Sequence, residues 1–294
     1  MASNSLRYQF KTASIITKLV VINGVIFLGT FLFSTLFQIE MGQLTKWFVL
    51  PSEIGRFITQ PWSIITYSFL HADFFHVLFN MLYLYWFGRF ILNLFTEKRF
   101  LTIYLLGAIF GGLLYFIGYN LFPVFAGERA VLLGASGAVM AIVVFVAAYN
   151  PQAQMRIFTF TIKIWHIALV LVILDVLRLS RNVNAGGMLA HLGGALFGFV
   201  YARRLLKGQD IGIWFEKIMD SFANLFKSRK EKPFKKVHRN RATQTRSKRS
   251  TTVKESKSDH QKKVDAILDK IGKSGYESLT KAEKDYLFKA GKNN

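Results

Sequence analysis

The sequence has no cysteine, only 5 prolines and few acidic residues. Without cysteine, disulfide bridges and thiolate metal sites are excluded. Only 17 of the 294 residues are Asp or Glu, against 38 Lys and Arg, which gives a net charge of +21. No His-Glu-x-x-His pair occurs, so a zinc site of that type is disfavoured, and no metal site is expected.

Apolar side chains dominate the composition. Hydrophobic residues make up 52% of the chain, 29 of them Phe, and the mean hydropathy is +0.29. Because these residues form long runs, the sequence predicts an all-α, polytopic integral membrane protein with a six-transmembrane-helix bundle. No cleavable signal peptide is expected, because a polar start precedes a run long enough to span. The expected spans are 15–37, 75–95, 100–122, 135–149, 164–179 and 188–206.

The connection over 39–62 mixes aromatic and aliphatic residues with Lys46, Glu53 and Arg56. It is too apolar for a solvated loop and too charged to span. We expect it to lie in the membrane interface with short amphipathic helices.

Positive charge collects at the C-terminal end, where about 25 of the 38 Lys and Arg follow residue 202. The positive-inside rule therefore places both termini in the cytoplasm. The expected division is a cytoplasmic segment 1–14, a membrane domain 15–206, a basic linker 207–263 and a small helical hairpin 264–294. Residues 227–263 have the composition of a disordered tail, with anionic lipid, and not nucleic acid, as the expected partner.

The hairpin has two signals of its own. Val264, Ile267, Leu268 and Ile271 recur at helical spacing before Ser274-Gly275 breaks the pattern. Thr280 and Glu283 then form a capping-box pattern at the start of a second helix.

Four polar residues share one depth in the expected bundle. The second, fourth and sixth spans all start at the outer face, and His76, Asn80, Ser136 and His191 lie in their first one or two turns. At 1.5 Å per residue, that is roughly 5–10 Å below the outer surface. Ionisable groups in a membrane usually face a bundle interior or a water-filled cavity. We therefore expect the four to form one site.

The residue types suit nucleophilic catalysis. Ser136 begins a helix, where backbone N–H groups lack intrahelical partners and carry the positive end of the dipole. A serine needs a base, and the imidazole of His191 is suitable. His76 and Asn80 share a helix face and can donate to a developing oxyanion, with the Ser136 N–H as a third donor.

Ser136 and His191 can meet only if their helices pack closely. Gly194 and Gly198 have the Gly-xxx-Gly spacing that lets helix backbones approach, and Gly134 and Gly137 supply small residues on the partner helix.

Each residue also has a structural interpretation. Ser136 can be a small packing residue, Asn80 a helix–helix hydrogen bond, and His191 a packing histidine. For Asp175, an ion pair with Arg178 at i+3 is expected in place of a catalytic role.

Three motifs resemble those of the rhomboid family of intramembrane serine proteases. Gly134-Ala135-Ser136-Gly137 resembles its Gly-x-Ser-Gly motif, His71-x4-His76-x3-Asn80 its second-helix motif, and His191-x-x-Gly194-x-x-x-Gly198 its sixth-helix motif. The resemblance implies a Ser136–His191 dyad without an acidic third member, His76 and Asn80 in the oxyanion hole, and no cofactor. It also implies a multi-pass location, expected here in a bacterial inner (cell) membrane.

Two departures from the family pattern occur. Trp62-Ser63 replaces a common Trp-Arg in the first loop, and Met140 replaces an aromatic residue one turn after the serine. A thioether still packs on an imidazole, so weaker positioning of His191 is expected, not inactivity.

The function implied is a serine endopeptidase that cleaves transmembrane segments of membrane proteins near their outer ends. The alternative is a catalytically weak or dead relative that binds membrane-protein clients. A solute transporter is a third class, but it would show internal repeats and broken helices, and neither is evident.

Overall fold

The computed structural model describes residues 5–157, 159–225 and 257–292. The chain divides into two compact units, residues 1–229 and 230–294, and each is described by itself.

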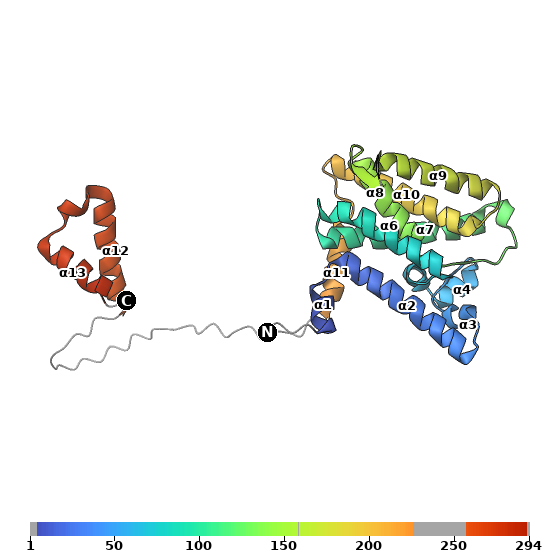
Figure 1. The fold of residues 1–294 in the computed structure, drawn as a ribbon, viewed down its shortest axis with the longest axis horizontal. Coiled ribbons are helices and arrows are strands. Elements are labelled where there is room, and N and C mark those ends of the chain that lie inside the picture. The colour runs from blue at the N-terminus through green and yellow to red at the C-terminus, as the bar shows by residue number, and fades with distance from the viewer. Residues whose placement is uncertain (1–4, 158, 226–256, 293–294) are drawn as a thin grey trace. The chain divides into compact units, whose positions relative to one another are not determined.

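Six helices of 14 to 25 residues form the bundle within the described part of the first unit (Figure 1). They confirm the all-α bundle and lie close to the expected spans. Four of them, α2, α6, α7 and α10, are long and apolar enough to cross a membrane. Their bounds are α2 (Ile15–Phe37), α6 (Phe74–Leu92), α7 (Glu97–Leu121), α8 (Ser136–Tyr149), α9 (Ile164–Ser180) and α10 (Ala185–Leu206).

The short helix α8 forms the centre of the bundle. It is buried over most of its length, and it packs chiefly against α10 and α7. Glycines allow this approach: a methyl group built on Gly194 would overlap the carbonyl of Gly137, and one on Gly198 would overlap that of Ala141. The helix α2, by contrast, lies at the periphery beside α6 and exposes most of its surface.

The connection between α2 and α6 contains short helices, as expected. Hydrogen bonds from side chains to backbone carbonyls hold this connection together. The Trp62 indole N–H donates to the Trp47 carbonyl (2.8 Å), and the Gln60 side-chain amide donates to the Val49 carbonyl (2.9 Å). The elements of this connection are α3 (Met41–Thr45), strand β1 (Leu50–Pro51), α4 (Ile54–Thr59), α5 (Ser63–Thr66) and η1 (Tyr67–Phe69). Strand β1 pairs antiparallel with β2 (Val131–Leu132), which joins the connection to the segment before α8.

Smaller elements complete the first unit. Helix α1 (Leu6–Thr12) precedes α2, and η2 (Pro123–Phe125) follows α7. Strands β3 (Gln154–Ile157) and β4 (Phe160–Lys163) form an antiparallel hairpin between α8 and α9.

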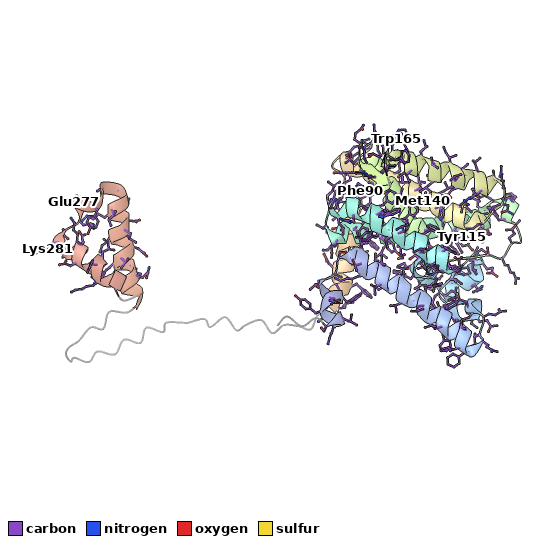
Figure 2. All side chains as sticks on the ribbon, in the orientation of Figure 1. Phe90, Tyr115, Met140, Trp165, Glu277 and Lys281 are labelled. Carbon is purple, nitrogen blue, oxygen red and sulfur yellow. The ribbon has the colours of Figure 1, made fainter. Side chains whose placement is uncertain are left out.

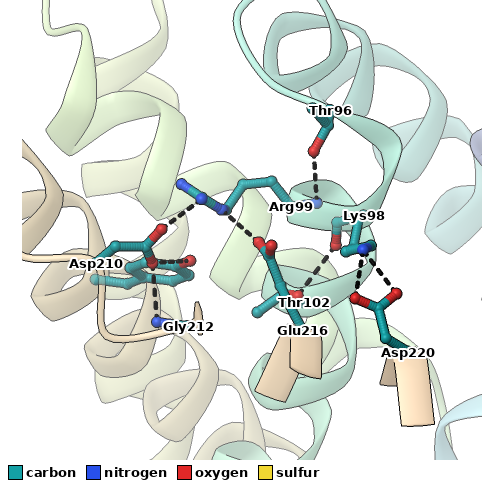
Figure 3. Close-up of polar contacts among 9 residues, drawn as sticks. Thr96, Lys98, Arg99, Thr102, Asp210, Gly212, Glu216 and Asp220 are labelled. Atoms are coloured by element: carbon teal, nitrogen blue, oxygen red, sulfur yellow. Dashed lines mark hydrogen bonds and ion pairs between the residues drawn. The ribbon is translucent and has the colours of Figure 1, made fainter. Parts of the chain in front are cut away.

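Helix α11 (Ile213–Leu225) lies within the segment 207–263 that the sequence predicts as a linker, so part of that segment is helical. Ion pairs hold it to the start of α7 (Figure 3). Arg99 reaches between Asp210 and Glu216, and its Nε lies 2.8 Å from Glu216 Oε1. Lys98 Nζ lies 2.7 Å from Asp220 Oδ1. Because these charges belong to two distant segments, sequence spacing did not reveal the pairing.

The second unit is a helical hairpin, described from residue 257 onward. It consists of α12 (Lys257–Ser274), η3 (Tyr276–Ser278) and α13 (Lys281–Lys292), so it starts seven residues before the expected boundary at 264. The capping box is confirmed: the Thr280 N–H donates to Glu283 Oε2 (2.7 Å), and the Glu283 N–H to Thr280 Oγ1 (3.4 Å). Of the tail expected to be disordered, 227–263, residues 227–256 lie outside the described residues, and residues 257–263 are helical as the start of α12.

Candidate active site

A cavity of about 810 Å³ lies between α6, α8, α9 and α10, at the end of the bundle where α6, α8 and α10 begin. Its lining includes all four of the predicted polar residues, His76, Asn80, Ser136 and His191. The lining also contains Asp175, which lies near the C-terminal end of α9.

Ser136 is the first residue of α8, as the sequence predicts. The first intrahelical bond at this end runs from the Val139 N–H to the Ala135 carbonyl (3.0 Å), so the Ser136 N–H precedes the hydrogen-bonded turns. Gly134 supplies the turn before the helix with φ +125°, and its N–H donates to the Tyr67 carbonyl (3.0 Å). A serine hydroxyl and a backbone donor therefore meet at the cavity wall.

Gly134 has a different role from the expected helix packing. A methyl group built on it would lie 2.7 Å from His76 Nε2 and 3.6 Å from Ser136 Oγ. Both the positive φ and this close approach require glycine at that position. Gly134 thus allows the His76 ring to approach Ser136. Gly134 itself lies in the turn before α8 and not within the helix.

Local contacts orient His76. Asp73 caps α6 by accepting from the His76 N–H (2.9 Å), and the Ala72 N–H points to His76 Nδ1 (3.5 Å). With Nδ1 as an acceptor, a neutral ring carries its proton on Nε2, the nitrogen beside Gly134. The ring therefore directs an N–H towards the position of Ser136.

His71, the first residue of the second-helix motif, lies in the loop before α6 and is buried. Its ring packs edge-on against that of His76, with centroids 5.1 Å apart. Burial lowers the pKa of His71 to about 3, so this ring is neutral at physiological pH. A neutral neighbour supports the His76 ring without adding charge to the site.

Asn80 is buried one turn below His76. One N–H of its amide donates to the His76 carbonyl (2.9 Å). Since a carboxamide has two N–H donors, a second remains for a group in the cavity.

Asp175 does not form the ion pair expected with Arg178. Its Oδ2 instead lies 3.0 Å from His191 Nδ1, and the side chain is only 7% exposed. Within the described residues no ion pair joins it to Arg178, which lines the same cavity. A carboxylate can only accept, so the shared proton lies on Nδ1, and a neutral ring keeps its lone pair on Nε2.

The depths of Asp175 and His191 in the bundle are consistent with this contact. Helix α9 runs opposite to α10, and Asp175 lies five residues before its end, whereas His191 lies six residues after the start of α10. At 1.5 Å per residue, the two side chains reach about the same depth.

Ser136 and His191 face one cavity but are not hydrogen-bonded to each other in the described structure. Such bonds are often long before substrate binds. Met140 lies one turn after Ser136, is buried inside the bundle and borders the cavity (Figure 2).

Comparison with known proteins identifies the membrane unit. The Rhomboid domain family model matches residues 59–208, half of the chain, and a family of unknown function (DUF6576) matches residues 251–291.

The curated relatives are also rhomboid-like. RHOMBOID-like protein 12, mitochondrial, from Arabidopsis thaliana is 33% identical over 50% of this chain and 47% of its own length. The human presenilin-associated rhomboid-like protein, mitochondrial, is 27% identical over 50% of this chain and 38% of its own length. Rhomboid protein 1, mitochondrial, from Saccharomyces cerevisiae is 27% identical over 58% and 51%. The chain spans about half or less of these relatives, and it belongs to the rhomboid family.

Proposed function

We propose that this protein is an intramembrane serine endopeptidase that cleaves transmembrane segments of other membrane proteins. The observation that carries the proposal is the single cavity shared by Ser136, His191, His76 and Asn80 in a rhomboid bundle. Other families place a nucleophile, a base and oxyanion donors around one reacting carbonyl in the same way.

In the proposed reaction, Ser136 Oγ attacks the carbonyl carbon of the scissile peptide while His191 Nε2 takes the hydroxyl proton. The tetrahedral intermediate collapses when the peptide C–N bond breaks, and His191 returns the proton to the leaving amine. An acyl ester remains on Ser136. Water, deprotonated by His191, then hydrolyses this ester and releases the new carboxyl end.

Three donors stabilise the oxyanion in this proposal: the Ser136 N–H, His76 Nε2–H and the free N–H of Asn80. Donors fixed before the reaction stabilise charge at no reorganisation cost, and loss of one typically costs about 10²–10³ in kcat.

Asp175 is proposed as a positioning residue for His191. Its carboxylate holds the proton on Nδ1 and aims Nε2 into the cavity. The dyad expected from the family resemblance thereby gains an acidic partner here. The contact also offsets the weaker packing expected from Met140, since a hydrogen bond fixes a ring more strictly than a thioether contact.

The alternative is a rhomboid-like protein that binds clients with little or no cleavage. The missing hydrogen bond between Ser136 and His191 is the observation in its favour. In either case the bilayer and membrane-protein clients are the partners.

We propose a multi-pass membrane protein with both termini on one side of the membrane, and we assign no compartment. The relatives named above carry mitochondrial names, in conflict with the bacterial cell membrane expected from the sequence.

Cleavage by the full chain in proteoliposomes tests the proposal. A single-span substrate with small and helix-breaking residues near its outer end should be cut by the wild type and not by Ser136→Ala. Ser180→Ala, which alters an exposed serine at the end of α9, is the matched control and should cut normally. Wild-type protein that retains the substrate through purification but never cuts it would support the client-binding alternative.

A further inference from the structure

A second cavity, lined almost entirely by apolar side chains, lies on the opposite side of α10 from the active site. This groove has a volume of about 480 Å³ and runs between α7 and α10. Phe110 and Phe197 stack within it, with ring centroids 4.8 Å apart, and several lining residues are exposed on the outer surface of the bundle. The lining includes Leu114, Leu196, Ile211 and Trp214.

The length of the groove fits one bilayer leaflet. On α7 its lining extends from Leu106 to Ile117. At 1.5 Å per residue that is about 16 Å, close to half of a hydrocarbon core of about 30 Å. The groove therefore matches the acyl chain of a single-leaflet lipid, whereas a spanning helix would need about twice this length.

Cations lie at the end of the groove beside the C-terminal end of α10, the side that the sequence predicts to be cytoplasmic. Val200 is its last residue on α10, and Arg204 and Lys207 follow at i+4 and i+7, on the same face. The Arg204 guanidinium donates to the neutral Gln209 amide oxygen (2.9 Å), and it has no ion pair within residues 5–157, 159–225 and 257–292. The nearby acids are already bound, because Asp210 and Glu216 pair with Arg99 and Asp220 pairs with Lys98 (Figure 3).

Helix α11 continues this surface at the membrane boundary. Its acidic side is tied to α7, and Trp214, Ile218 and Leu225 form an exposed apolar stripe on another side. Trp214 belongs both to this stripe and to the end wall of the groove. Tryptophan at such a boundary is typical of the headgroup level, and an amphipathic helix with this pattern lies in the plane of the interface.

We propose that the groove binds one anionic phospholipid of the cytoplasmic leaflet. An acyl chain occupies the space between α7 and α10, Trp214 closes its end, and Arg204 and Lys207 bind the phosphate-bearing headgroup. Basic sites between transmembrane helices on this side of a membrane are suited to anionic headgroups. The proposal is independent of the proteolytic function.

Native mass spectrometry of the detergent-solubilised full chain tests the site. The probes are phosphatidylglycerol and phosphatidylcholine with identical oleoyl chains. We expect phosphatidylglycerol to bind at least about fivefold more tightly, the preference that one Lys or Arg near an anionic headgroup provides. The double variant Arg204→Gln/Lys207→Gln should lower its binding to the level of phosphatidylcholine.

Two further variants keep the test decisive. Leu196→Trp adds bulk at a 61% exposed position and should reduce binding of both lipids without lowering the unfolding temperature. Arg7→Gln/Lys11→Gln removes the same charge from α1 and should keep the preference for phosphatidylglycerol. Unchanged lipid binding in the Arg204/Lys207 or Leu196 variant would overturn the proposal. So would efficient cross-linking of two chains through Leu196→Cys, which would identify a second copy as the occupant.

Discussion

The hydrogen bond between Asp175 and His191 determines which imidazole nitrogen can act as a base. With the proton held on Nδ1, Nε2 is available to accept from Ser136. The same bond restrains the ring at the wall of the cavity. Orientation of this kind affects the transition state more than substrate binding, and kinetic measurements can separate the two effects.

Asp175→Leu tests this role, because leucine has the same number and branching of side-chain heavy atoms as aspartate but cannot accept a hydrogen bond. We expect kcat to fall about 10- to 10²-fold with KM little changed, because a base that is free to rotate spends less time aligned. The unfolding temperature should fall only slightly, because the His191 Nδ1–H that loses its acceptor belongs to a side chain that is still 19% exposed. Cleavage kinetics and thermal unfolding in detergent give both values.

A purely structural role would lower stability and activity together. An equal loss of stability in Arg178→Leu would point instead to the ion pair expected from the sequence.

Asn80→Ala and His76→Ala test the oxyanion donors. Each should lower kcat by about 10²–10³, because each removes a donor aimed at the developing charge. Asn80→Ala should leave the fold nearly intact, since the one hydrogen bond of its side chain among the described residues is within its own helix. Turnover at the wild-type rate in both variants would show that the assignment is wrong.

At the scale of helices, glycine positions decide how closely α8 and α10 approach. Gly198→Ala should destabilise the bundle by about 1–3 kcal/mol, because the added methyl group meets the Ala141 carbonyl. Gly24→Ala on α2 is the matched control: nothing lies within 4 Å of the added methyl group, so stability should hold or rise. Thermal unfolding of both variants in the same detergent measures the effect. Equal shifts of the unfolding temperature in Gly198→Ala and Gly24→Ala would argue against close helix packing as the reason for glycine at position 198.

The ion pairs that hold α11 should differ in strength. Asp210 and Arg99 are 11% and 17% exposed, whereas Asp220 and Lys98 are 53% and 42% exposed. Asp210→Asn should therefore lower the free energy of unfolding by about 1–3 kcal/mol, because it also weakens the hydrogen bonds that Asp210 accepts from Tyr201 and Gly212. Asp220→Asn should lower it by only about 0–1 kcal/mol. Hydrogen exchange of residues 213–225 measures the loosening. The reverse order would contradict the burial argument.

The helices of the bundle could be predicted because hydrophobic run length is a local property of the sequence. Helix α11 was missed because its basic surroundings resemble a linker, and its docking depends on charges more than a hundred residues apart in the sequence. The pairing of β1 with β2 was missed for a related reason, since two-residue strands carry no periodic signal.

For the molecule as a whole, motif order and depth predicted which residues would meet in one cavity. The sequence could not predict the contacts that orient them. The position of Gly134 against His76 and the choice of His191 as the partner of Asp175 depend on how three helices rotate about their axes. Spacing along one helix favoured Arg178 for Asp175, but the neighbouring helix provided the closer partner.

The central claim is that Ser136 is a nucleophile activated by His191. The most direct measurement is mass spectrometry of the full chain after reaction with a fluorophosphonate, with the modified peptide located in the digest. We predict an adduct on Ser136 in the wild type, none in Ser136→Ala, and severely reduced labelling in His191→Ala, whose serine lacks a proton acceptor. No adduct in the wild type, an adduct on another serine, or undiminished labelling of His191→Ala would contradict the claim.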